Sequence, residues 1–139
     1  MTDEIILHAS TVVYNGHGLL IEGPSGSGKS SLALSLLALG ADLVADDRTK
    51  VFLGEAENRP MVVAPRTLPA LIEARGVGLL PARLRGPCRL ALAVDLGVRE
   101  QDRLPLSKTR SYLGRDVTLL HNTGRVDFAA ALLQYLKSL

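Results

Sequence analysis

The chain has 139 residues, of which 47% are hydrophobic, 22% charged and 4% aromatic. This length and composition suffice for a globular core and exclude a disordered or fibrous protein. No apolar run approaches the roughly 20 residues of a membrane span, and the first residues lack the basic and apolar pattern of a secretion signal. The one cysteine, Cys88, is expected to be a free thiol. We therefore expect a cytoplasmic protein without a membrane partner.

The net charge of +2 hides an uneven distribution along the chain. Residues 1–74 carry 5 basic and 9 acidic side chains, whereas residues 75–139 carry 11 and 5, most of the basic ones arginine. Arginine suits phosphate and carboxylate groups because its planar fork donates two parallel hydrogen bonds. The few aromatic residues do not alternate with these arginines, so nucleic acid is not an expected partner.

Hydrophobic periodicity and turn residues predict the secondary structure in chain order. The predicted elements are a strand over 4–14, a hairpin turn at Asn15-Gly16, a strand over 18–22, a helix from Lys29 to a glycine stop at Gly40, a strand over 43–45, a hairpin of 50–55 and 59–65, a short helix over 68–74, a strand over 89–96, a polar loop over 99–115, a strand over 116–121 and a helix capped by Asp127. No repeat or linker divides the chain. Residues 1–139 are therefore expected to form one domain of the α/β class, with more strands than helices.

One motif carries chemistry. Residues 23–30, GPSGSGKS, match the phosphate-binding pattern G-x-x-x-x-G-K-[ST], after a predicted strand and at the start of a predicted helix. The glycines let backbone amides surround phosphate groups, Lys29 reaches the terminal phosphates, and the Ser30 hydroxyl is a ligand for Mg²⁺. We therefore expect ATP and Mg²⁺ as cofactors. The residues expected to bind the nucleotide are Gly23, Pro24, Ser25, Gly26, Ser27, Gly28, Lys29 and Ser30.

A phosphate-binding loop of this kind needs a further acidic side chain, and two places compete for that role. Residues 90–95 form an apolar strand that ends in Asp95, while residues 43–47 form a shorter run that ends in Asp46 and Asp47. The strand pattern slightly favours Asp95. Two adjacent carboxylates near a triphosphate instead favour a proton-accepting role. The pattern alone leaves the choice open.

Further stretches of the sequence are shared with a known family. They are His8-Ala9-Ser10, the loop 23–30, LVADDR at 43–48, IEARGVGLL at 72–80 and, more loosely, QDRL at 101–104. With these motifs in this order, residues 5–105 resemble the catalytic domain of the HPr kinase/phosphorylase family. The acidic doublet and the E-x-R-G-x-G segment make this resemblance more specific than the phosphate-binding loop alone.

The resemblance implies a P-loop nucleotide-binding fold of the phosphoenolpyruvate carboxykinase type, rich in strands and with two principal helices. It also implies transfer of the ATP γ-phosphoryl group to a serine of the phosphocarrier protein HPr, and removal of that group by phosphorolysis. The chain is similar to short members that consist of the catalytic domain alone. A homo-oligomer, a hexamer in the family, is implied as well. After residue 105 the resemblance thins, and with it the support for the phosphorylase activity and the hexamer.

The resemblance further implies roles for single residues. Lys29 would bind phosphate, and Ser30 and Glu73 would hold Mg²⁺. Arg75 belongs to the shared E-x-R-G-x-G segment.

The same resemblance implies the residues of the transfer step. Asp47 would be the catalytic base, with His8 beside it, and Arg103 would stabilise the transferring charge. Asp46 is the partner of Asp47 in the doublet, and Asp95 is structural in this interpretation.

Two other functions remain open at this point. A small-molecule P-loop kinase would use residues 99–115 as a lid, and a regulatory module would bind nucleotide without turnover. The second predicted hairpin and the E-x-R-G-x-G segment favour the protein kinase over the small-molecule kinase. The regulatory module stays open, and replacing Asp47 by Asn would distinguish it from an enzyme.

Overall fold

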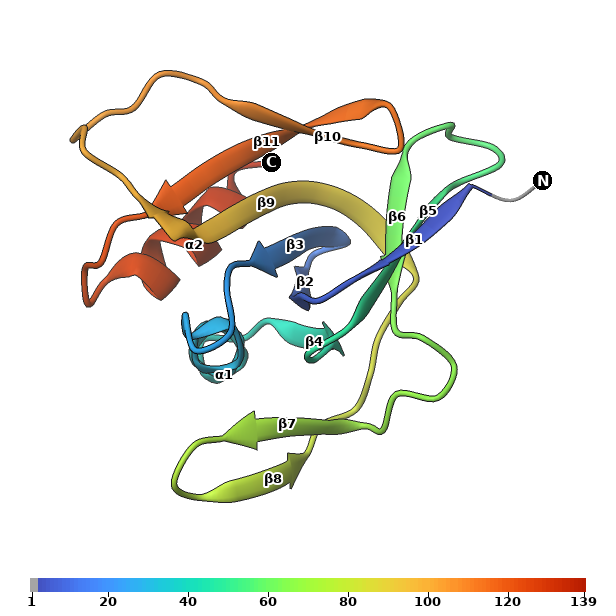
Figure 1. Cartoon of the computed structure of the whole chain (residues 1–139), viewed down its shortest axis with the longest axis horizontal. Coiled ribbons are helices and arrows are strands. Elements are labelled where there is room, and N and C mark those ends of the chain that lie inside the picture. Colours follow the sequence, from blue (N-terminus) through green and yellow to red (C-terminus); the bar gives the residue numbers. More distant parts are fainter. Residues whose placement is uncertain (1–2) are drawn as a thin grey trace.

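A computed structural model describes residues 3–139 as a mixed β-sheet with two helices (Figure 1). In chain order the elements are β1 (Glu4–Leu7), β2 (Ser10–Tyr14), β3 (His17–Glu22), α1 (Lys29–Ala38), β4 (Asp42–Ala45), β5 (Thr49–Leu53), β6 (Pro60–Val63), β7 (Leu71–Ala74), β8 (Gly78–Pro81), β9 (Cys88–Arg99), β10 (Thr109–Tyr112), β11 (Arg115–Asn122) and α2 (Phe128–Lys137). The predicted α/β class, rich in strands and with two principal helices, is confirmed. Within this described part of the chain, neither helix is long and apolar enough to cross a membrane.

Strand β9 is the centre of the main sheet because it pairs with three other strands. It runs parallel to β3 and β11 and antiparallel to β6. The sheet continues through β3 and β2 to β4, and through β6 and β5 to β1, while β10 pairs with β11. Glu22 of β3 lies opposite Asp95 of β9 in the parallel register. The carboxyl ends of these strands therefore lie at the same end of the sheet, which is where α/β sheets bind their ligands.

Both faces of the sheet are buried at β3, as its continuous apolar run indicates. Leu19 and Ile21 belong to a core cluster with Leu36 of α1 and Leu132 of α2. Leu20, between them, belongs to a second cluster with side chains of β9, β10 and β11. Successive strand residues point to opposite faces. Packing on both faces fixes the end of β3, from which the loop 23–30 leaves the sheet.

The predicted strand over 4–14 is divided at His8 and Ala9. β1 pairs with β5, whereas β2 pairs with β3 and β4, so the chain changes neighbours between the two strands. The sequence is rich in β-forming residues throughout and carries no sign of this change. Because Leu7 lies opposite Thr49, the division places His8 next to the residues that precede β5.

The predicted short helix over 68–74 is wrong. This segment contains β7, which pairs antiparallel with β8 in a separate two-stranded sheet. Ile72 and Ala74 are buried while Glu73 between them is exposed, which is the period of a strand. Gly76 has a φ of 83° in the turn. The hairpin packs on α1, and this tertiary contact overrides the local helical pattern.

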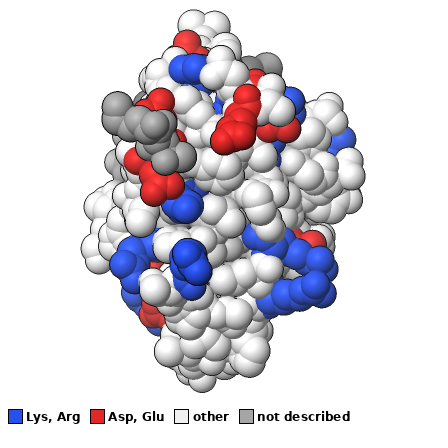
Figure 2. Space-filling view, turned by 90° about the vertical axis from the view of Figure 1, so that its right-hand side faces the viewer, with Lys and Arg blue, Asp and Glu red and all other residues white. Residues whose placement is uncertain are grey.

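The β7–β8 hairpin forms the lower end of the molecule in Figure 1. Val77 and Leu79 are exposed there. On the face shown in Figure 2 this end carries no charged side chain, and basic groups lie above it. The hairpin thus presents an apolar tip on the same element that carries Glu73.

The polar loop predicted over 99–115 is shorter than expected. β9 continues to Arg99, and β10 pairs with β11 through a tight turn at Leu113 and Gly114. Both turn residues have a positive φ, 53° and 80°. A leucine in this conformation is uncommon, so the turn has no ordinary sequence signal.

Asp127 occupies the position before α2, as predicted, but its side chain does not cap the helix. Its carboxylate accepts a hydrogen bond from Nε of Arg125 at 3.1 Å, instead of bonds from the first amides of the helix. Burial of one apolar face of α2, including Phe128 and Leu136, therefore holds this helix in place.

Candidate functional site

The loop 23–30 connects β3 to the start of α1, as its motif predicts. Gly26 and Gly28 have φ angles of 80° and 97°, and a Cβ on either would meet no atom within 4 Å. The backbone of the loop is thus left-handed at Gly26 and Gly28, and the space beside these two residues is empty. The start of a helix favours negative charge, so this geometry fits a phosphate group.

Lys29 lies across its own loop. Its Nζ donates hydrogen bonds to the carbonyl oxygens of Gly23 (2.9 Å) and Pro24 (3.2 Å). Only 8% of the residue is exposed. The side chain of Ser27 packs against Gly23 inside the loop. The two are so close that a Cβ on Gly23 would lie 2.6 Å from Oγ of Ser27. These contacts hold the ammonium group at the loop, where a phosphate group can replace the carbonyl oxygens.

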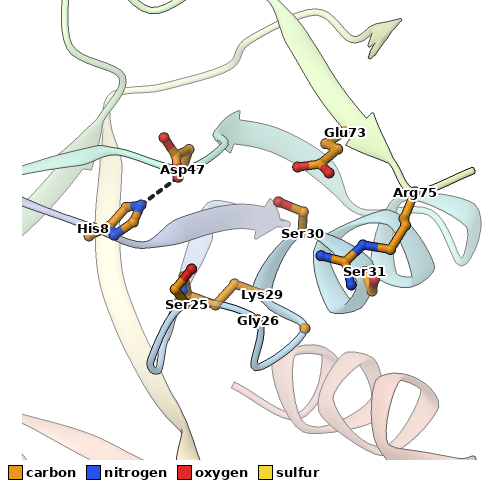
Figure 3. A pocket seen from close by; sticks show the side chains of 10 residues that line it. His8, Ser25, Gly26, Lys29, Ser30, Ser31, Asp47, Glu73 and Arg75 are labelled. Carbon is orange, nitrogen blue, oxygen red and sulfur yellow. Dashed lines mark hydrogen bonds and ion pairs between the residues drawn. The ribbon is translucent and has the colours of Figure 1, made fainter. Parts of the chain in front are cut away.

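Most of the predicted site residues line one cavity of about 170 Å³ above this loop (Figure 3). Its lining residues are His8, Ser25, Gly26, Gly28, Lys29, Ser30, Ser31, Asp47, Glu73 and Arg75. They come from the β1–β2 junction, the loop 23–30, the segment after β4 and the β7–β8 hairpin. The tertiary structure therefore joins four of the five stretches on which the family resemblance rests.

Arg103 does not lie in this cavity. It lines a separate, mainly apolar cavity beside α2, with Leu120 and Phe128 among its neighbours. The structure thus does not bring Arg103 together with Lys29 and Asp47, and its catalytic role stays a prediction.

Asp46 is the centre of a hydrogen-bond network that includes two residues of the cavity, Ser30 and Glu73. Its Oδ1 accepts bonds from the hydroxyls of Ser10 and Ser30, both at 2.7 Å. Its Oδ2 accepts a bond from the backbone amide of Glu73 at 3.1 Å. One carboxylate therefore joins β2, α1 and β7.

The sequence identified Asp46 only as half of a doublet and assigned no role to Ser10. The available signals were the doublet and the shared stretch His8-Ala9-Ser10. Neither showed that the two meet, because a contact across 36 residues depends on strand register.

Asp47 turns away from this network and towards the cavity. Nε2 of His8 lies 2.6 Å from Oδ1 of Asp47, and the contact is drawn in Figure 3. Asp47 has a φ of 71°, a left-handed conformation that few residues other than glycine, asparagine and aspartate adopt. The side chains of Asp46 and Asp47 therefore have different surroundings, one buried among donors and one exposed beside a histidine.

Asp95 lies at the same edge of the sheet but has another partner. Its Oδ2 accepts a bond of 2.9 Å from Arg110, and its Oδ1 accepts one of 2.8 Å from the amide of Gly97. Burial alone would raise the pKa of Asp95, but these bonds and the Arg110 charge outweigh it and leave the pKa below its ordinary value. Two places compete for the acidic role beside the phosphate-binding loop. The Asp46 carboxylate contacts Ser30 of this loop, whereas the charge of the Asp95 carboxylate is neutralised by Arg110.

The side chains of Ser30, Asp46 and Glu73 carry oxygen atoms, which are the ligands that Mg²⁺ prefers. Among residues 3–139, no three His, Cys, Asp or Glu side chains stand close enough together to hold a metal ion by themselves. Mg²⁺ commonly binds through one or two carboxylates, water and the phosphates of a substrate. The residues present therefore fit a magnesium ion that is bound together with a nucleotide.

The family model described as HPr Serine kinase C-terminal domain matches residues 1–85. The match covers more than half of the chain, which therefore belongs to this family.

Curated relatives carry the same family name. The HPr kinase/phosphorylase of Bordetella avium (strain 197N) is 43% identical in an alignment 114 residues long, which spans 73% of this chain and 37% of that protein. The one of Enterococcus faecalis (strain ATCC 700802 / V583) is 29% identical in an alignment 154 residues long, which spans 93% of this chain and 49% of that protein. The chain thus spans less than half the length of these relatives.

A solved structure, that of the Hpr(Ser) kinase/phosphatase from Coxiella burnetii, matches with a TM-score of 0.73 and 23% sequence identity. The match covers 96% of this chain and 88% of that one. The two chains therefore share a fold, and the resemblance predicted from the motifs is confirmed at the level of family and fold.

Proposed function

We propose that this chain is an ATP- and Mg²⁺-dependent serine kinase whose substrate is an HPr-like phosphocarrier protein. One observation carries the proposal: the loop 23–30, the Asp47–His8 pair and Glu73 line a single cavity. The curated relatives named HPr kinase/phosphorylase support the same substrate.

The chain's own residues account for nucleotide binding. Lys29 exchanges the carbonyl oxygens of Gly23 and Pro24 for phosphate oxygens. Ser30 donates its proton to Asp46, so the lone pairs of its oxygen remain free for a metal ion. Glu73, on β7, offers a further carboxylate at the same cavity.

Phosphoryl transfer requires mainly positioning and the neutralisation of charge. Bound ATP would supply the phosphoryl group, and Mg²⁺ would offset the negative charge of its phosphates. Asp47 is exposed at the cavity and accepts the proton of the acceptor serine hydroxyl. His8 orients this carboxylate through their hydrogen bond.

The same carboxylate would serve the reverse reaction. Protonated Asp47 returns its proton to the serine oxygen when inorganic phosphate accepts the phosphoryl group and pyrophosphate forms. The homo-oligomer, a hexamer in the family, stays part of this proposal, and sedimentation of the purified chain tests it.

The test incubates the purified chain with Mg-ATP and a panel of purified HPr-like carriers, and determines their intact mass. We expect one added phosphoryl group per carrier. Lys29→Ala and Asp47→Asn should abolish it, and Asp47→Asn should still bind ATP. Lys137→Ala and Asp116→Asn are matched controls, because both residues lie outside the cavity and should leave transfer unchanged.

Each other result points to one of the competing functions. Transfer to a small-molecule hydroxyl but to no carrier would identify a small-molecule kinase. ATP binding without any transfer would identify a nucleotide-binding regulatory module.

A further inference from the structure

Ser10 lies between the two aspartates without reaching the cavity. It is the first residue of β2 and is completely buried. Its hydroxyl donates to Oδ1 of Asp46 at 2.7 Å and accepts a bond from the backbone amide of Asp47 at 3.3 Å. The Ser10 hydroxyl thus contacts both aspartates, Asp46 at its carboxylate and Asp47 at its backbone amide.

The backbone at Asp47 needs such support. Its φ of 71° is left-handed, a conformation that is disfavoured for residues with a Cβ and that aspartate adopts mainly where local hydrogen bonds support it. The turn is further held by a bond of 2.8 Å from the amide of Arg48 to the carbonyl of Asp46. Without the Ser10 hydroxyl, the Asp47 amide would lose the hydrogen bond that ties this turn to β2.

Ser10 also connects the turn to His8. The two residues are separated only by Ala9, which is fully buried and cannot shift freely. His8 contacts the carboxylate of Asp47, while Ser10 contacts its backbone. The short segment from residue 8 to residue 10 therefore holds Asp47 at two points and Asp46 at one.

We propose that Ser10 is a positioning residue for phosphoryl transfer, which holds Asp46 against Ser30 and holds Asp47 in the conformation that directs its carboxylate to the cavity. The proposal rests on the proposed function, because it concerns the base of that reaction. Ser10 acts through the aspartates and contacts no substrate. Its loss should therefore slow turnover much more than it weakens the binding of ATP.

A neighbouring hydroxyl provides a matched control. Thr11 is the next residue in β2, is equally buried, and its Oγ1 lies 2.8 Å from Oγ1 of Thr49. This pair makes no hydrogen bond to Asp46 or Asp47. Thr11→Val removes a buried hydroxyl of the same strand at nearly constant volume, so it measures the general cost of such a loss.

The experiment compares the wild-type chain with Ser10→Ala, Ser10→Thr and Thr11→Val. For each, kcat and KM for phosphoryl transfer to the carrier, the dissociation constant of ATP and the free energy of unfolding are measured. We expect Ser10→Ala to lower kcat by about tenfold or more, with the ATP dissociation constant changed less than about threefold. Ser10→Thr keeps the hydroxyl and should recover most of kcat. Thr11→Val should retain the wild-type kcat.

Two results overturn the proposal. One is a kcat of Ser10→Ala within twofold of the wild type. The other is an equal loss in Thr11→Val, which would show that β2 merely needs its buried hydroxyls. If the wild-type chain transfers no phosphoryl group, the proposed function fails and this proposal fails with it. An active wild type with an unaffected Ser10→Ala overturns this proposal alone.

Discussion

His8 and Asp47 lie 39 positions apart in the sequence, yet Nε2 of one is 2.6 Å from Oδ1 of the other. The contact forms at the point where β1 ends and β5 is about to begin. Both side chains are largely exposed, 62% for His8 and 67% for Asp47. An exposed pair contributes little to stability, about 0–1 kcal/mol. A pair that is held at a cavity and adds so little to stability is better explained by chemistry than by folding.

His8→Ala should therefore affect turnover and leave the fold intact. We expect kcat for phosphoryl transfer to fall by about tenfold to a hundredfold, since general base catalysis depends on the orientation of the base. The free energy of unfolding should change by less than about 1 kcal/mol. Time courses of carrier phosphorylation and urea denaturation test both expectations. His121→Ala, on β11 and outside the cavity, is the control. A large loss of stability in His8→Ala with unchanged kcat would contradict this assignment.

The Arg110–Asp95 pair predicts a pH-dependent contribution to stability. The pKa of Asp95 is below its ordinary value in the folded protein, although burial opposes this, because Arg110 and the Gly97 amide donate to it. A lowered pKa stabilises the fold above the ordinary pKa of the carboxyl group, and this contribution disappears as the pH falls through the folded value.

We expect Arg110→Met to lower the free energy of unfolding by about 1–2 kcal/mol at pH 7. The difference from the wild type should shrink as the pH is lowered towards about 2. Urea denaturation over this pH range measures it. Arg125→Met removes a much more exposed pair with Asp127 and should cost less than about 0.5 kcal/mol at pH 7. A loss in Arg110→Met that does not vary with pH would show that Arg110 acts by packing alone.

Cys88 should be an unreactive thiol. Burial raises its pKa from 9.0 to about 11, so the folded protein holds about 100-fold less thiolate near pH 8 than the unfolded chain. We expect iodoacetamide to modify the native protein about 100 times more slowly than the protein in urea, as followed by intact mass. Equal rates would mean that the thiol is exposed to solvent in the native state.

Gly18 is required by the close approach of two strands. A Cβ at this position would lie 2.7 Å from the carbonyl oxygen of Arg89 and 3.0 Å from Cγ2 of Val62. Gly18→Ala must therefore displace β3 from β9, and we expect a loss of about 2–3 kcal/mol in urea denaturation.

Gly16→Ala separates this effect from backbone strain. Gly16 has a φ of 80° and open space around it, so its substitution costs only about 1–2 kcal/mol of strain. A loss in Gly18→Ala no greater than that in Gly16→Ala would contradict the steric explanation.

Local sequence was sufficient for part of the fold and of the site. The loop 23–30 and α1 follow from contiguous residues: glycines that adopt a positive φ, then a lysine and a serine at the start of a helix. The strands over 18–22 and 89–96 follow from apolar runs that are buried on both faces. In each case the signal lies within about ten residues, so no distant partner is needed to interpret it.

Other features depend on partners that lie far away along the chain. Residues 71–74 form a strand because they pair with β8 and pack on α1, against their local helical pattern. The predicted strand over 4–14 divides because its two halves pair with different neighbours. Periodicity describes which face of an element is apolar, and it contains no information about which element will cover that face.

The sequence by itself determined the family, the phosphate-binding motif and the set of acidic candidates. Only the tertiary structure decided that Asp46 contacts Ser30, that Arg110 neutralises Asp95, and that Arg103 lies away from the cavity. The physical reason is that these contacts are set by strand order and register. A shift of one residue in register reverses the direction of every side chain in a strand, and no local pattern specifies which distant side chains will meet.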